Sequence, residues 1–487
     1  MPNTEKHPIP VLKETKWGSS QTLPLGFRAL DFFRISDFGF RPSNHGLRAG
    51  TMPQRGSILV GLLWCLALLS VIVIGVLHTA RMDLLVVKNY GDRIQAHYLA
   101  LAGIEKARAL LYQDAHDRSR SQKNHTGDLY DNEKQFRDVA FGRGTFRIMH
   151  RGRPDEGGGI IFGVSDEESR LNVNTATAEE LTQLQNLTPD VAKAIVNWRG
   201  GDTTARAAET QYYADLQPPY QPRLGPYQTV RELLLVRGVT PEDLLGRDQH
   251  QNGLLAAAEG GSFAFPNSID SEDLGWAGVF TVDSTVQNLN AAGEDRVNLQ
   301  TADESTLTTI QGITPAMAHA VVAYRDQHRF QSIADLLDVT PPQNQPGAIG
   351  GPDSSSGQVI SETLFMDIAD KITTENGQSL AGAINVNTAS LAVLMCLPGV
   401  SRELAQSIVS HRQADGFFAN TGELLKLPEM TRDIFKQVAP LVTARSETYR
   451  LLCEGRISSS GVRQRIQAIV HISLSSQQVL SWREDDL

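Results

Sequence analysis

The chain has 487 residues, enough for two to four domains of roughly 150 residues each. Its 45 basic and 55 acidic residues give a net charge of −10, which argues against a dedicated nucleic-acid binder. Three widely separated cysteines exclude a disulfide framework and the paired spacing of a zinc site. We expect all three to be free thiols, with a bridge between Cys396 and Cys453 as the alternative.

The first predicted element is an apolar helix. Residues 1–51 before it show no sustained helix or strand period. Residues 57–80 then contain no Asp, Glu, Lys or Arg, and about 20 apolar helical residues suffice to cross a bilayer. A secretory signal has a shorter apolar region and a small-residue cleavage site, which this stretch lacks. We therefore predict a membrane-inserted helix, with a buried helix of a soluble protein as the alternative.

The same helix is predicted to continue as an amphipathic segment to about Tyr112. Apolar side chains recur at spacings of three and four after Arg81, and no proline occurs between Pro53 and Pro154. A helix that starts at Ser57 would be on the order of 80 Å long. Its first half suits lipid, and its second half suits one face of a globular domain.

This arrangement resembles that of type IV pilins and type II secretion pseudopilins. In those families a prepilin peptidase cuts after a glycine that follows a short basic leader, and the matching stretch PQRG|SILVG places the cut between Gly56 and Ser57. Most members carry glutamate at the fifth mature position, where this chain has Gly61. The minor pseudopilins called K lack that glutamate, and AHYLALAGIEKARALL (96–111) is also similar to them. The chain is thus identified as a member of the K family, whose subunit is placed at the pseudopilus tip.

The short leaders of pseudopilins bear on the first 51 residues. A start at Met52 leaves MPQRG, residues 52–56, as a leader of the expected kind. We therefore interpret Met52 as the initiator and residues 1–51 as a non-native extension or start-site artefact. A long leader removed together with Gly56 is the alternative.

Three copies of one helical unit follow along the chain. They read LNVNTATAEELTQLQNLTPDVAKAIVNWR from Leu171, VNLQTADESTLTTIQGITPAMAHAVVAYR from Val297 and INVNTASLAVLMCLPGVSRELAQSIVSHR from Ile384. Their apolar positions superpose, each copy ends in arginine, and an aromatic-led helix follows each. The pattern predicts two short helices around a tight turn and is similar to the helix-hairpin-helix family.

Cap and turn residues support this reading of the copies. Capping boxes are predicted where a glutamate follows a threonine by three residues, at Thr177 with Glu180 and at Thr301 with Glu304. The tight turns fall at equivalent positions, namely Asn186, Gly312 and Gly399. DNA-binding hairpins usually read Gly-x-Gly there, so that backbone N–H groups reach a phosphate. The second glycine is missing in all three turns, and an acidic residue follows in two, so we expect a structural role rather than nucleic-acid binding.

Strand signals bracket the three copies and set the predicted fold class. They lie at 143–151, 158–164, 448–457, 463–473 and 477–484. K-type pseudopilins insert a helical domain within the pilin head, and the resemblance covers roughly residues 52–487. The prediction is an α+β, pilin-like fold, in which a long N-terminal helix packs on a small antiparallel sheet with a large inserted all-α, helix-hairpin-helix or SAM-like region. Residues 200–220 are predicted to be an exposed loop.

These signals give the predicted organisation in chain order: 1–51, extension; 52–56, leader; 57–80, transmembrane half of the helix; 81–165, amphipathic helix and first strands; 166–260, first helical repeat with its insertion and an ion loop; 261–339, second repeat; 340–358, linker; 359–445, third repeat; 446–487, C-terminal pilin strands.

A calcium loop is predicted at DQHQNGLLAAAE, residues 248–259. It fits the frame D-x-[DN]-x-[DN]-G-x5-E with one mismatch. The candidate ligands are Asp248, Asn252, the backbone carbonyl of Leu254 and Glu259. The calcium binding of K-type pseudopilins supports an ion here, with weakened affinity because only two carboxylates remain; a polar surface loop is the alternative. No other cofactor is expected.

The sequence contains no HExxH, CxxC or Walker motif, and we expect a protein that is not an enzyme. The resemblance implies a minor pseudopilin that takes part in protein export across the outer membrane. It also implies a single-pass helix in the bacterial inner membrane, a periplasmic head, and a place at the pseudopilus tip after assembly. The implied partners are the minor pseudopilins I and J, prepilin peptidase and the inner membrane. The alternative is a membrane-tethered helix-hairpin-helix DNA-binding protein or competence pilin-like protein.

Overall fold

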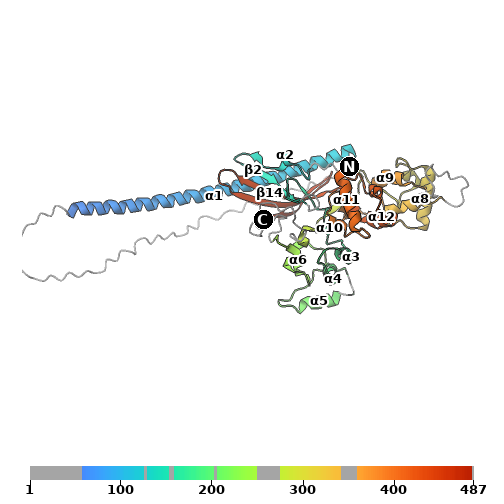
Figure 1. Ribbon diagram of the computed structural model, residues 1–487, viewed down its shortest axis with the longest axis horizontal. Helices are drawn as coiled ribbons and strands as arrows, with labels where there is room; N and C mark the ends of the chain where they lie inside the picture. Colours follow the sequence, from blue (N-terminus) through green and yellow to red (C-terminus); the bar gives the residue numbers. More distant parts are fainter. Residues whose placement is uncertain are drawn as a thin grey trace, which may run out of the picture. The chain divides into compact units, whose positions relative to one another are not determined.

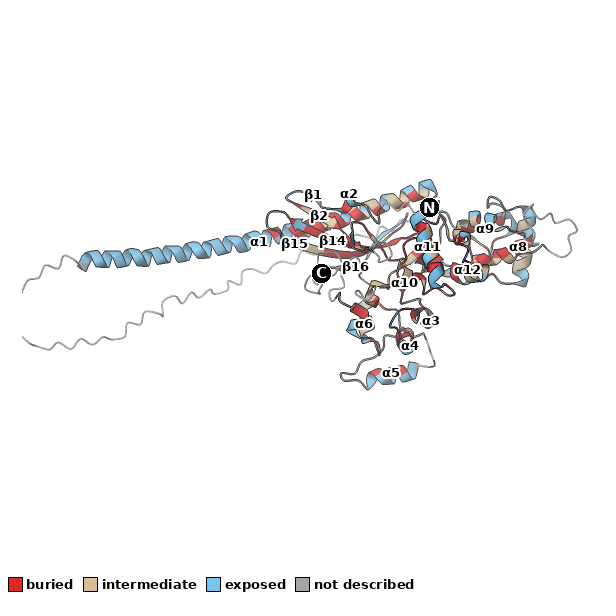
Figure 2. Ribbon diagram, in the orientation of Figure 1, coloured by how far each residue is buried: buried red, intermediate tan, exposed pale blue. Residues whose placement is uncertain are grey.

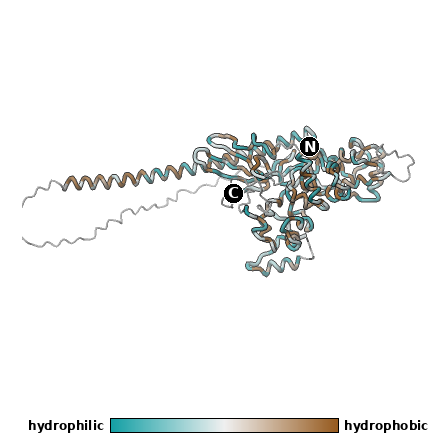
Figure 3. Tube along the Cα trace, in the orientation of Figure 1, coloured by the Kyte–Doolittle hydropathy of each residue, from teal (hydrophilic) through white to brown (hydrophobic). Residues whose placement is uncertain are grey.

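The computed structural model describes residues 57–124, 129–152, 158–201, 204, 206–248, 275–341 and 359–484. The described residues fall into two units, one that ends at residue 77 and one that begins at residue 78, and we call the second unit the head. Helix α1 (Ser57–Ser121) begins in the first unit, where its apolar side chains from Ile58 to Leu77 are exposed (Figures 2 and 3). Among the described residues, α1 is the one helix whose length and composition suit a membrane crossing.

Helix α1 continues beyond the predicted end near Tyr112. The apolar period fades there, but two of the following residues, Ala115 and Arg118, are buried in the head. The Arg118 guanidinium lies 3.0 Å from the Asp114 carboxylate, one turn earlier on the helix. Arg118 also donates to the backbone carbonyl of Ser446 at 3.2 Å. Burial and this contact outside the helix extend α1 beyond the point where the hydrophobic pattern ends.

The head contains an antiparallel sheet formed by strands from both ends of the chain (Figure 1). Its main order is β1–β2–β14–β15–β16, and β5 also pairs with β14. The bounds are β1 (Val139–Phe141), β2 (Gly144–Ile148), β5 (Ser165–Asp166), β14 (Thr448–Ile457), β15 (Arg463–Ile472) and β16 (Gln477–Arg483). A short helix α2 (Glu133–Phe136) and the hairpin of β3 (His150–Arg151) with β4 (Ile160–Ile161) complete this part. The predicted split of the sheet by an insertion is confirmed.

The C-terminal part of α1 packs on one face of this sheet. The buried helix residues Ala96, Ala100 and Ile104 share a core with Phe146 on β2 and Cys453 on β14. Alternate residues of the long strands face the helix, as expected for a sheet covered on one side. The predicted α+β class, with a long helix on an antiparallel sheet and a large helical insertion, is confirmed.

The insertion consists of three hairpin units, each opened and closed by a parallel pair of two-residue strands. The first unit runs from β6 (Leu171–Asn172) through α3 (Ala178–Leu181), α4 (Pro189–Trp198), α5 (Arg206–Ala214), η2 (Val230–Leu235), α6 (Pro241–Leu245) and η5 (Trp276–Gly278) to β7 (Phe280–Thr281). The second runs from β9 (Val297–Asn298) through α7 (Glu304–Leu307), α8 (Pro315–Gln327), η6 (Ile333–Asp338), α9 (Glu362–Ile368) and η7 (Ala369–Lys371) to β10 (Ile372–Thr373).

The third unit runs from β12 (Ile384–Asn385) through α10 (Leu391–Leu394), α11 (Arg402–Ala414), η8 (Thr421–Lys426), α12 (Arg432–Val438) and η9 (Ala439–Leu441) to β13 (Val442–Thr443). Strands β8 (Thr285–Gln287) and β11 (Ser379–Ala381) pair antiparallel between the units. The buried side chains of all three units form one hydrophobic core, distinct from the core under the sheet.

The strand pairs place the unit boundaries differently from the sequence. The β6–β7 pair carries the first unit to Thr281, past the predicted boundary at 260. The β9–β10 pair places α9 in the second unit, whereas the boundary at 359 assigned it to the third. A closing strand of two residues has no periodic signal, so only the first hairpin of each unit stands out in the sequence.

The caps agree with the sequence in one unit and differ in another. The capping box of Thr177 with Glu180 is confirmed at α3. The box of Thr301 with Glu304 is wrong, because Asp303 caps α7 and accepts the backbone N–H of Thr306. Asp303 is the residue that aligns with Thr177, and a short carboxylate serves this position as well as a hydroxyl does.

The predicted exposed loop at 200–220 is also wrong. It contains α5, whose Tyr213 is fully buried, with its ring 5.1 Å from the Trp198 ring in an edge-to-face arrangement. The Tyr213 hydroxyl accepts the backbone N–H of Arg237 at 3.0 Å. One aromatic anchor thus holds a polar segment whose composition resembles that of a loop. The expectation of free thiols is confirmed for Cys65, Cys396 and Cys453.

The hairpin turns require left-handed backbone at one residue each. The φ angles are +63° at Asn186, +98° at Gly312 and +72° at Gly399. Because a Cβ without a local hydrogen-bonding group disfavours this region, we expect Asn186→Ala to lower the free energy of unfolding by about 1 kcal/mol. Asn186→Gly should lose nothing by the same urea titration. Equal stability of the two variants would contradict the argument.

Candidate interaction site

Three consecutive acidic residues form the junction between the sheet and the hairpin units. Asp166 is the last residue of β5, and Glu167 and Glu168 follow it directly. Strand β5 pairs with the start of β14 through Asp166 opposite Tyr449. All three side chains are buried, with exposed fractions of 4%, 0% and 0%. A buried carboxylate is stable only with charged or hydrogen-bonding partners. Each of the three carboxylates has such partners in a different part of the head.

Asp166 holds the third hairpin unit. Its Oδ2 accepts a hydrogen bond from the Asn385 side-chain amide at 3.0 Å, and from the hydroxyls of Thr388 and Ser446. Its Oδ1 accepts the backbone N–H of Glu168 at 2.8 Å, which fixes the local turn. The opening strand and the residues just after the closing strand of that unit are thereby joined to β5.

Glu167 joins the sheet to the first hairpin unit. Its carboxylate receives two hydrogen bonds from Arg450 on β14, at 2.6 and 3.2 Å, and one from the hydroxyl of Thr281 on β7. The Arg170 guanidinium lies 3.8 Å away. Burial alone would raise the pKa of Glu167, but the charges of Arg450 and Arg170 outweigh it and lower that pKa.

Glu168 has only neutral hydrogen-bond donors among the contacts of its carboxyl group. Its two oxygens accept the backbone N–H groups of Thr285 and Thr448, each at 3.1 Å. Burial, and then the negative charge of Asp166, raise the pKa of Glu168 well above its usual value. The two adjacent glutamates are therefore shifted in opposite directions.

The raised pKa of Glu168 predicts a specific pH effect. Its stabilising contribution is present below the pKa of an unfolded glutamate, about 4.3, and is lost as pH rises toward the folded pKa. Glu168→Gln keeps a neutral group and should flatten the fall in the free energy of unfolding above that pH. Urea titrations at a series of pH values measure it, and parallel profiles of the two proteins would contradict the assignment.

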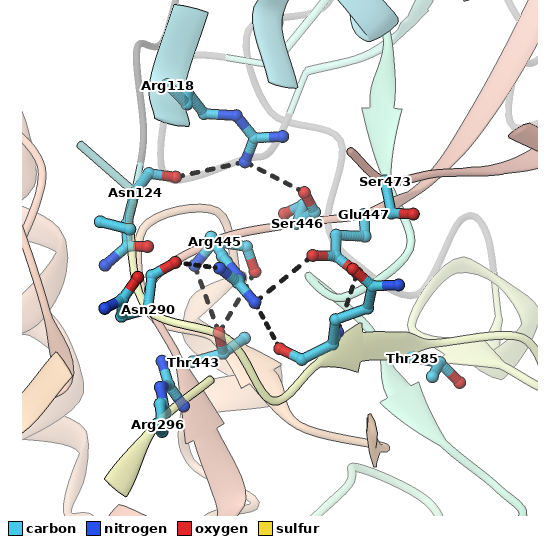
Figure 4. A network of polar contacts seen from close by, with 12 residues as sticks. Arg118, Asn124, Thr285, Asn290, Arg296, Thr443, Arg445, Ser446, Glu447 and Ser473 are labelled. Atoms are coloured by element: carbon cyan, nitrogen blue, oxygen red, sulfur yellow. Dashed lines mark hydrogen bonds and ion pairs between the residues drawn. The ribbon is translucent and has the colours of Figure 1, made fainter. Parts of the chain in front are cut away.

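A second polar network lies beside the junction (Figure 4). Arg118, on α1, donates to the backbone carbonyls of Asn124 at 3.3 Å and Ser446 at 3.2 Å. The buried Arg445 donates to the carbonyl of Asn290 at 3.1 Å and lies 3.4 Å from the Glu447 carboxylate. Burial lowers the pKa of Arg445 to about 10. The network ties helix α1 to the start of β14 and to the connection between the first two units.

The same end of α1 also reaches the second and third units. The Asn124 side-chain amide donates to the Asp370 carboxylate at 2.8 Å and to the carbonyl of Ala419 at 2.9 Å. Arg296 contacts the same carboxylate at 3.1 Å. All three hairpin units are therefore held to the pilin-like part by hydrogen bonds and ion pairs rather than by one shared apolar core.

The head encloses a groove with a volume of about 1370 Å³. One wall is the face of the sheet that α1 does not cover, and the others come from the first and third hairpin units. Helix α11 presents one stripe to it, formed by Arg402, Gln406, Val409 and Gln413 at helical spacing. The first unit contributes its hairpin turn, including Gln185 and Asn186.

The hairpin turns are poorly suited to phosphate. Pro189 and Pro315 occupy the first turn of α4 and α8 and have no N–H to offer. At the start of α11, Ser401 accepts the backbone N–H of Leu404 at 3.3 Å, and the Glu403 carboxylate stands at the same helix end. At each helix start at least one donor that could bind a phosphate is absent or already used, and α4 and α11 also carry an acidic residue in their first turn.

The predicted processing and ion-site residues are covered only in part. Ser57 is the first residue of α1 and Gly61 lies one turn later, whereas Gly56 lies outside the described residues. Asp248 is buried and lines the groove, while its predicted co-ligands lie outside the described residues, namely Asn252, Leu254 and Glu259. The described residues contain no group of three or more His, Cys, Asp and Glu side chains placed to hold a metal. The calcium site therefore stays a prediction with one described donor.

The acidic junction and the groove were not predicted as sites. The junction had a usable signal, because three consecutive acids directly before a hairpin repeat are unusual for a segment that the fold must bury. The groove had none, because Arg151, Gln406 and Arg483 come from distant segments.

A segment of the chain that includes this junction matches a known family model. Residues 164–246 match the family Type II secretion system (T2SS), protein K, and residues 293–341 and 381–443 match the helix-hairpin-helix motif. The first match begins two residues before the acidic junction and covers the first hairpin unit to the end of α6.

The curated relatives are matched over only about a quarter of their own length. The endonuclease/exonuclease/phosphatase family domain-containing protein 1 of Xenopus laevis is 33% identical over 174 residues, which are 35% of this chain and 24% of that protein. The Bos taurus protein of the same name is 30% identical over 175 residues, 35% of this chain and 25% of that protein. The chain thus spans about a quarter of the length of these relatives.

Among solved structures, the chain is similar to one from the GspK–GspI–GspJ complex of the enterotoxigenic Escherichia coli type 2 secretion system. The sequences are 11% identical, the TM-score is 0.38, and the match covers 81% of this chain and 98% of that chain.

Proposed function

We propose that this chain, a GspK-like protein of type II secretion, is a minor pseudopilin and has a structural rather than an enzymatic role. The proposal rests on two features that occur together in this chain, the inserted segment and the apolar helix. The segment that matches protein K is inserted into an antiparallel sheet that packs on a long helix, and that helix begins with an exposed apolar segment. A pilin-like subunit needs both parts, because one helix must serve first in lipid and later in a polymer.

In this proposal, prepilin peptidase removes the leader after Gly56, and the helix that starts at Ser57 anchors the chain in the inner membrane before assembly. The head lies in the periplasm and takes part in protein export across the outer membrane. At the fifth mature position this chain has Gly61, where most members carry glutamate. This supports a place at the tip, because a tip subunit has no further subunit above it and therefore no neighbouring N-terminal amine whose charge a glutamate would neutralise. The proposed partners are the minor pseudopilins I and J, and a calcium ion is proposed at Asp248, Asn252, Leu254 and Glu259.

Co-expression of the full chain with prepilin peptidase tests processing. The expected result is a membrane-retained protein whose N-terminus is Ser57, determined by mass spectrometry. Gly56→Phe should keep its leader, whereas Gly75→Ala, a glycine substitution within α1, should be processed normally. An N-terminus elsewhere in the co-expressed protein would contradict the proposal.

Assembly is tested by co-purification of the head with the heads of pseudopilins I and J. A complex of the three supports the proposal, and its absence in a system that assembles the I and J heads contradicts the partner assignment. Binding of duplex DNA by the head, with an affinity that falls steeply with salt, would instead favour a DNA-handling protein.

A further inference from the structure

We propose that the outer edge of strand β16 binds an extended segment of a partner polypeptide, which adds one strand to the sheet of the head. The segment is expected to alternate apolar and polar side chains. This inference goes beyond the pseudopilin role, because strand addition is a property of the folded head and does not depend on pseudopilus assembly. Three observations carry it: the open edge of β16, the exposed apolar side chains beside that edge, and the contacts that hold the end of the strand in place.

Strand β16 lies at one end of the sheet, and its outer edge is long. Among the residues that the structure describes, β15 is the one strand that pairs with β16, so the other edge of its seven residues faces no strand. The opposite end of the sheet differs, because β1 has only three residues and contacts helix α2. An open edge presents backbone N–H and C=O groups at the spacing of a neighbouring strand. An extended main chain is the ligand whose own groups match that spacing.

Strand β16 lacks most of the features that protect an open edge. Folded proteins usually block such an edge with lysine, proline or a β-bulge. Strand β16 contains neither lysine nor proline, and its one protective feature is a bulge at Leu480, where the register with β15 shifts. Because a bulge leaves one residue out of the pairing, an added strand is expected to pair on both sides of Leu480.

Apolar side chains accompany the open edge on one face of the sheet. Val479 pairs with Val470, and Trp482 pairs with Ala468. Both partners on β15 are fully buried in the core that the sheet shares with α1, and paired residues share one face of a sheet. Val479 and Trp482 therefore lie on the α1 side, where each is 39% exposed. Apolar side chains of an added strand would cover them.

The other face of an added strand would meet a more polar surface. Ser481 and Arg483 line the groove, together with Gln467 and Ile469 on β15. An added strand would therefore continue the sheet wall of the groove. Successive side chains of a strand point to opposite faces, so the two different faces beside β16 favour a ligand with alternating apolar and polar residues. This selection depends on the pattern of the ligand and not on its charge.

Contacts to α1 hold the end of β16 in place. The indole N–H of Trp482 donates to the Glu484 carboxylate, and Nδ1 of His97 on α1 lies 3.7 Å from the same carboxylate. The edge is therefore ordered before a ligand arrives. A binding surface that is already ordered loses less conformational entropy on binding, which favours a specific complex.

Fluorescence anisotropy with the full chain in detergent tests the proposal. The probe is a fluorescein-labelled peptide in which valine alternates with threonine over about seven residues, roughly 23 Å when extended, with one lysine at each end for solubility. A peptide of the same composition, with all its valines in one block, is the control for alternation. We expect saturable binding of the alternating peptide and about tenfold weaker binding of the block peptide.

Two N-methylated peptides show whether the main chain makes the contact. Alternate residues of a strand turn their N–H groups toward opposite edges. Methylation of either the valine or the threonine amides should therefore abolish binding in one peptide and leave it nearly unchanged in the other. Hydrogen–deuterium exchange gives a second readout, because the amides of β16 should exchange more slowly when the alternating peptide is bound.

Two lysine substitutions at opposite ends of the sheet locate the binding. Val479→Lys places a charge on the open edge and should weaken binding of the alternating peptide about tenfold. Phe141→Lys introduces the same charge on β1, where the phenylalanine is 61% exposed, and should leave the affinity unchanged. Circular dichroism checks that both variants are folded. The methylation and exchange measurements use the parent protein, so they decide the question even where Val479→Lys does not fold.

Several results would overturn the proposal. They are no saturable binding of the alternating peptide, equal affinity for the block peptide, equal effects of the two methylation patterns, unchanged exchange of the β16 amides, or unchanged affinity in folded Val479→Lys. A dimer of the parent chain that Val479→Lys dissociates would instead assign the edge to a second copy of this chain. Processing at Gly56 is measured separately, so a failure here leaves that proposal unaffected.

Discussion

Replacing Gly455 with alanine is expected to lower the free energy of unfolding of the head by about 3 kcal/mol or more. Gly455 lies on β14 where the strand passes under α1. A Cβ built there would overlap the carbonyl oxygen of Ala96 and would lie 2.7 Å from the backbone N of Ala100 and 3.0 Å from Leu99 Cβ. Backbone atoms of a helix cannot rotate away as a side chain can, so the sheet and the helix would have to separate.

Small residues on both surfaces make this close approach possible. Ala96 and Ala100 are fully buried on the helix face, and Gly103 continues the same face. A Cβ on Gly103 would overlap Cys453 Sγ and lie 2.8 Å from a ring carbon of Phe146. Separating the two layers to admit one methyl group would therefore weaken contacts along the whole interface, because protein interiors are close-packed.

Gly91→Ala is the matched control for this prediction. Gly91 lies on the same helix, and nothing lies within 4 Å of a Cβ built there. The substitution should leave stability unchanged or raise it by up to about 1 kcal/mol, because alanine favours a helix over glycine. Urea unfolding followed by circular dichroism compares the two variants. Equal stability of Gly455→Ala and the parent protein would show that the helix does not pack on β14 as described.

The elements that the sequence predicts well are those with a long, regular pattern. The strand expected at 448–457 is β14 itself, and the strands expected at 463–473 and 477–484 each end one residue earlier in the structure. Helix α1 includes the whole of the apolar run from Ser57. In these segments the local pattern and the buried face agree over many residues, so tertiary contacts have little to override.

The features that escaped prediction depend on single contacts between distant residues. The two-residue strands β7 and β10 exist because each completes a hairpin unit. Helix α5 is held by the burial of Tyr213. The groove combines the sheet with two hairpin units, and no local pattern reports such a juxtaposition. Sequence analysis could therefore locate the hairpin turns, but could not show which walls of the groove they would form.

Removing the Glu167 carboxylate is expected to have the second large effect, a loss of about 3–5 kcal/mol in the free energy of unfolding for Glu167→Ala. The substitution leaves Arg450, hydrogen-bonded to this carboxylate at 2.6 and 3.2 Å, and the nearby Arg170 without their buried counter-charge. It also removes the acceptor for the Thr281 hydroxyl, which joins the first hairpin unit to the sheet. The cost comes mainly from uncompensated buried charge rather than from the lost volume.

The pH dependence gives this prediction a second readout. Because the folded pKa of Glu167 is lowered, its stabilising contribution is present above about pH 4.3 and is lost as pH falls toward the folded pKa. The parent protein should therefore lose this contribution in acid, whereas Glu167→Ala has already lost it and should show a flatter acid limb. Glu168→Gln acts on the opposite side of the profile, which separates the roles of two adjacent glutamates.

An exposed ion pair provides the matched control for Glu167. Glu133 contacts Arg137 at 3.0 Å, and both side chains are more than half exposed. Water and salt screen such a pair, so Glu133→Ala should change stability by only about 0.5 kcal/mol or less. A double-mutant cycle of Glu167→Gln with Arg450→Met then measures the buried coupling directly. If Glu167→Ala costs no more than Glu133→Ala, the acidic junction does not hold the hairpin units to the sheet, because a buried carboxylate with three partners cannot be lost without a large penalty.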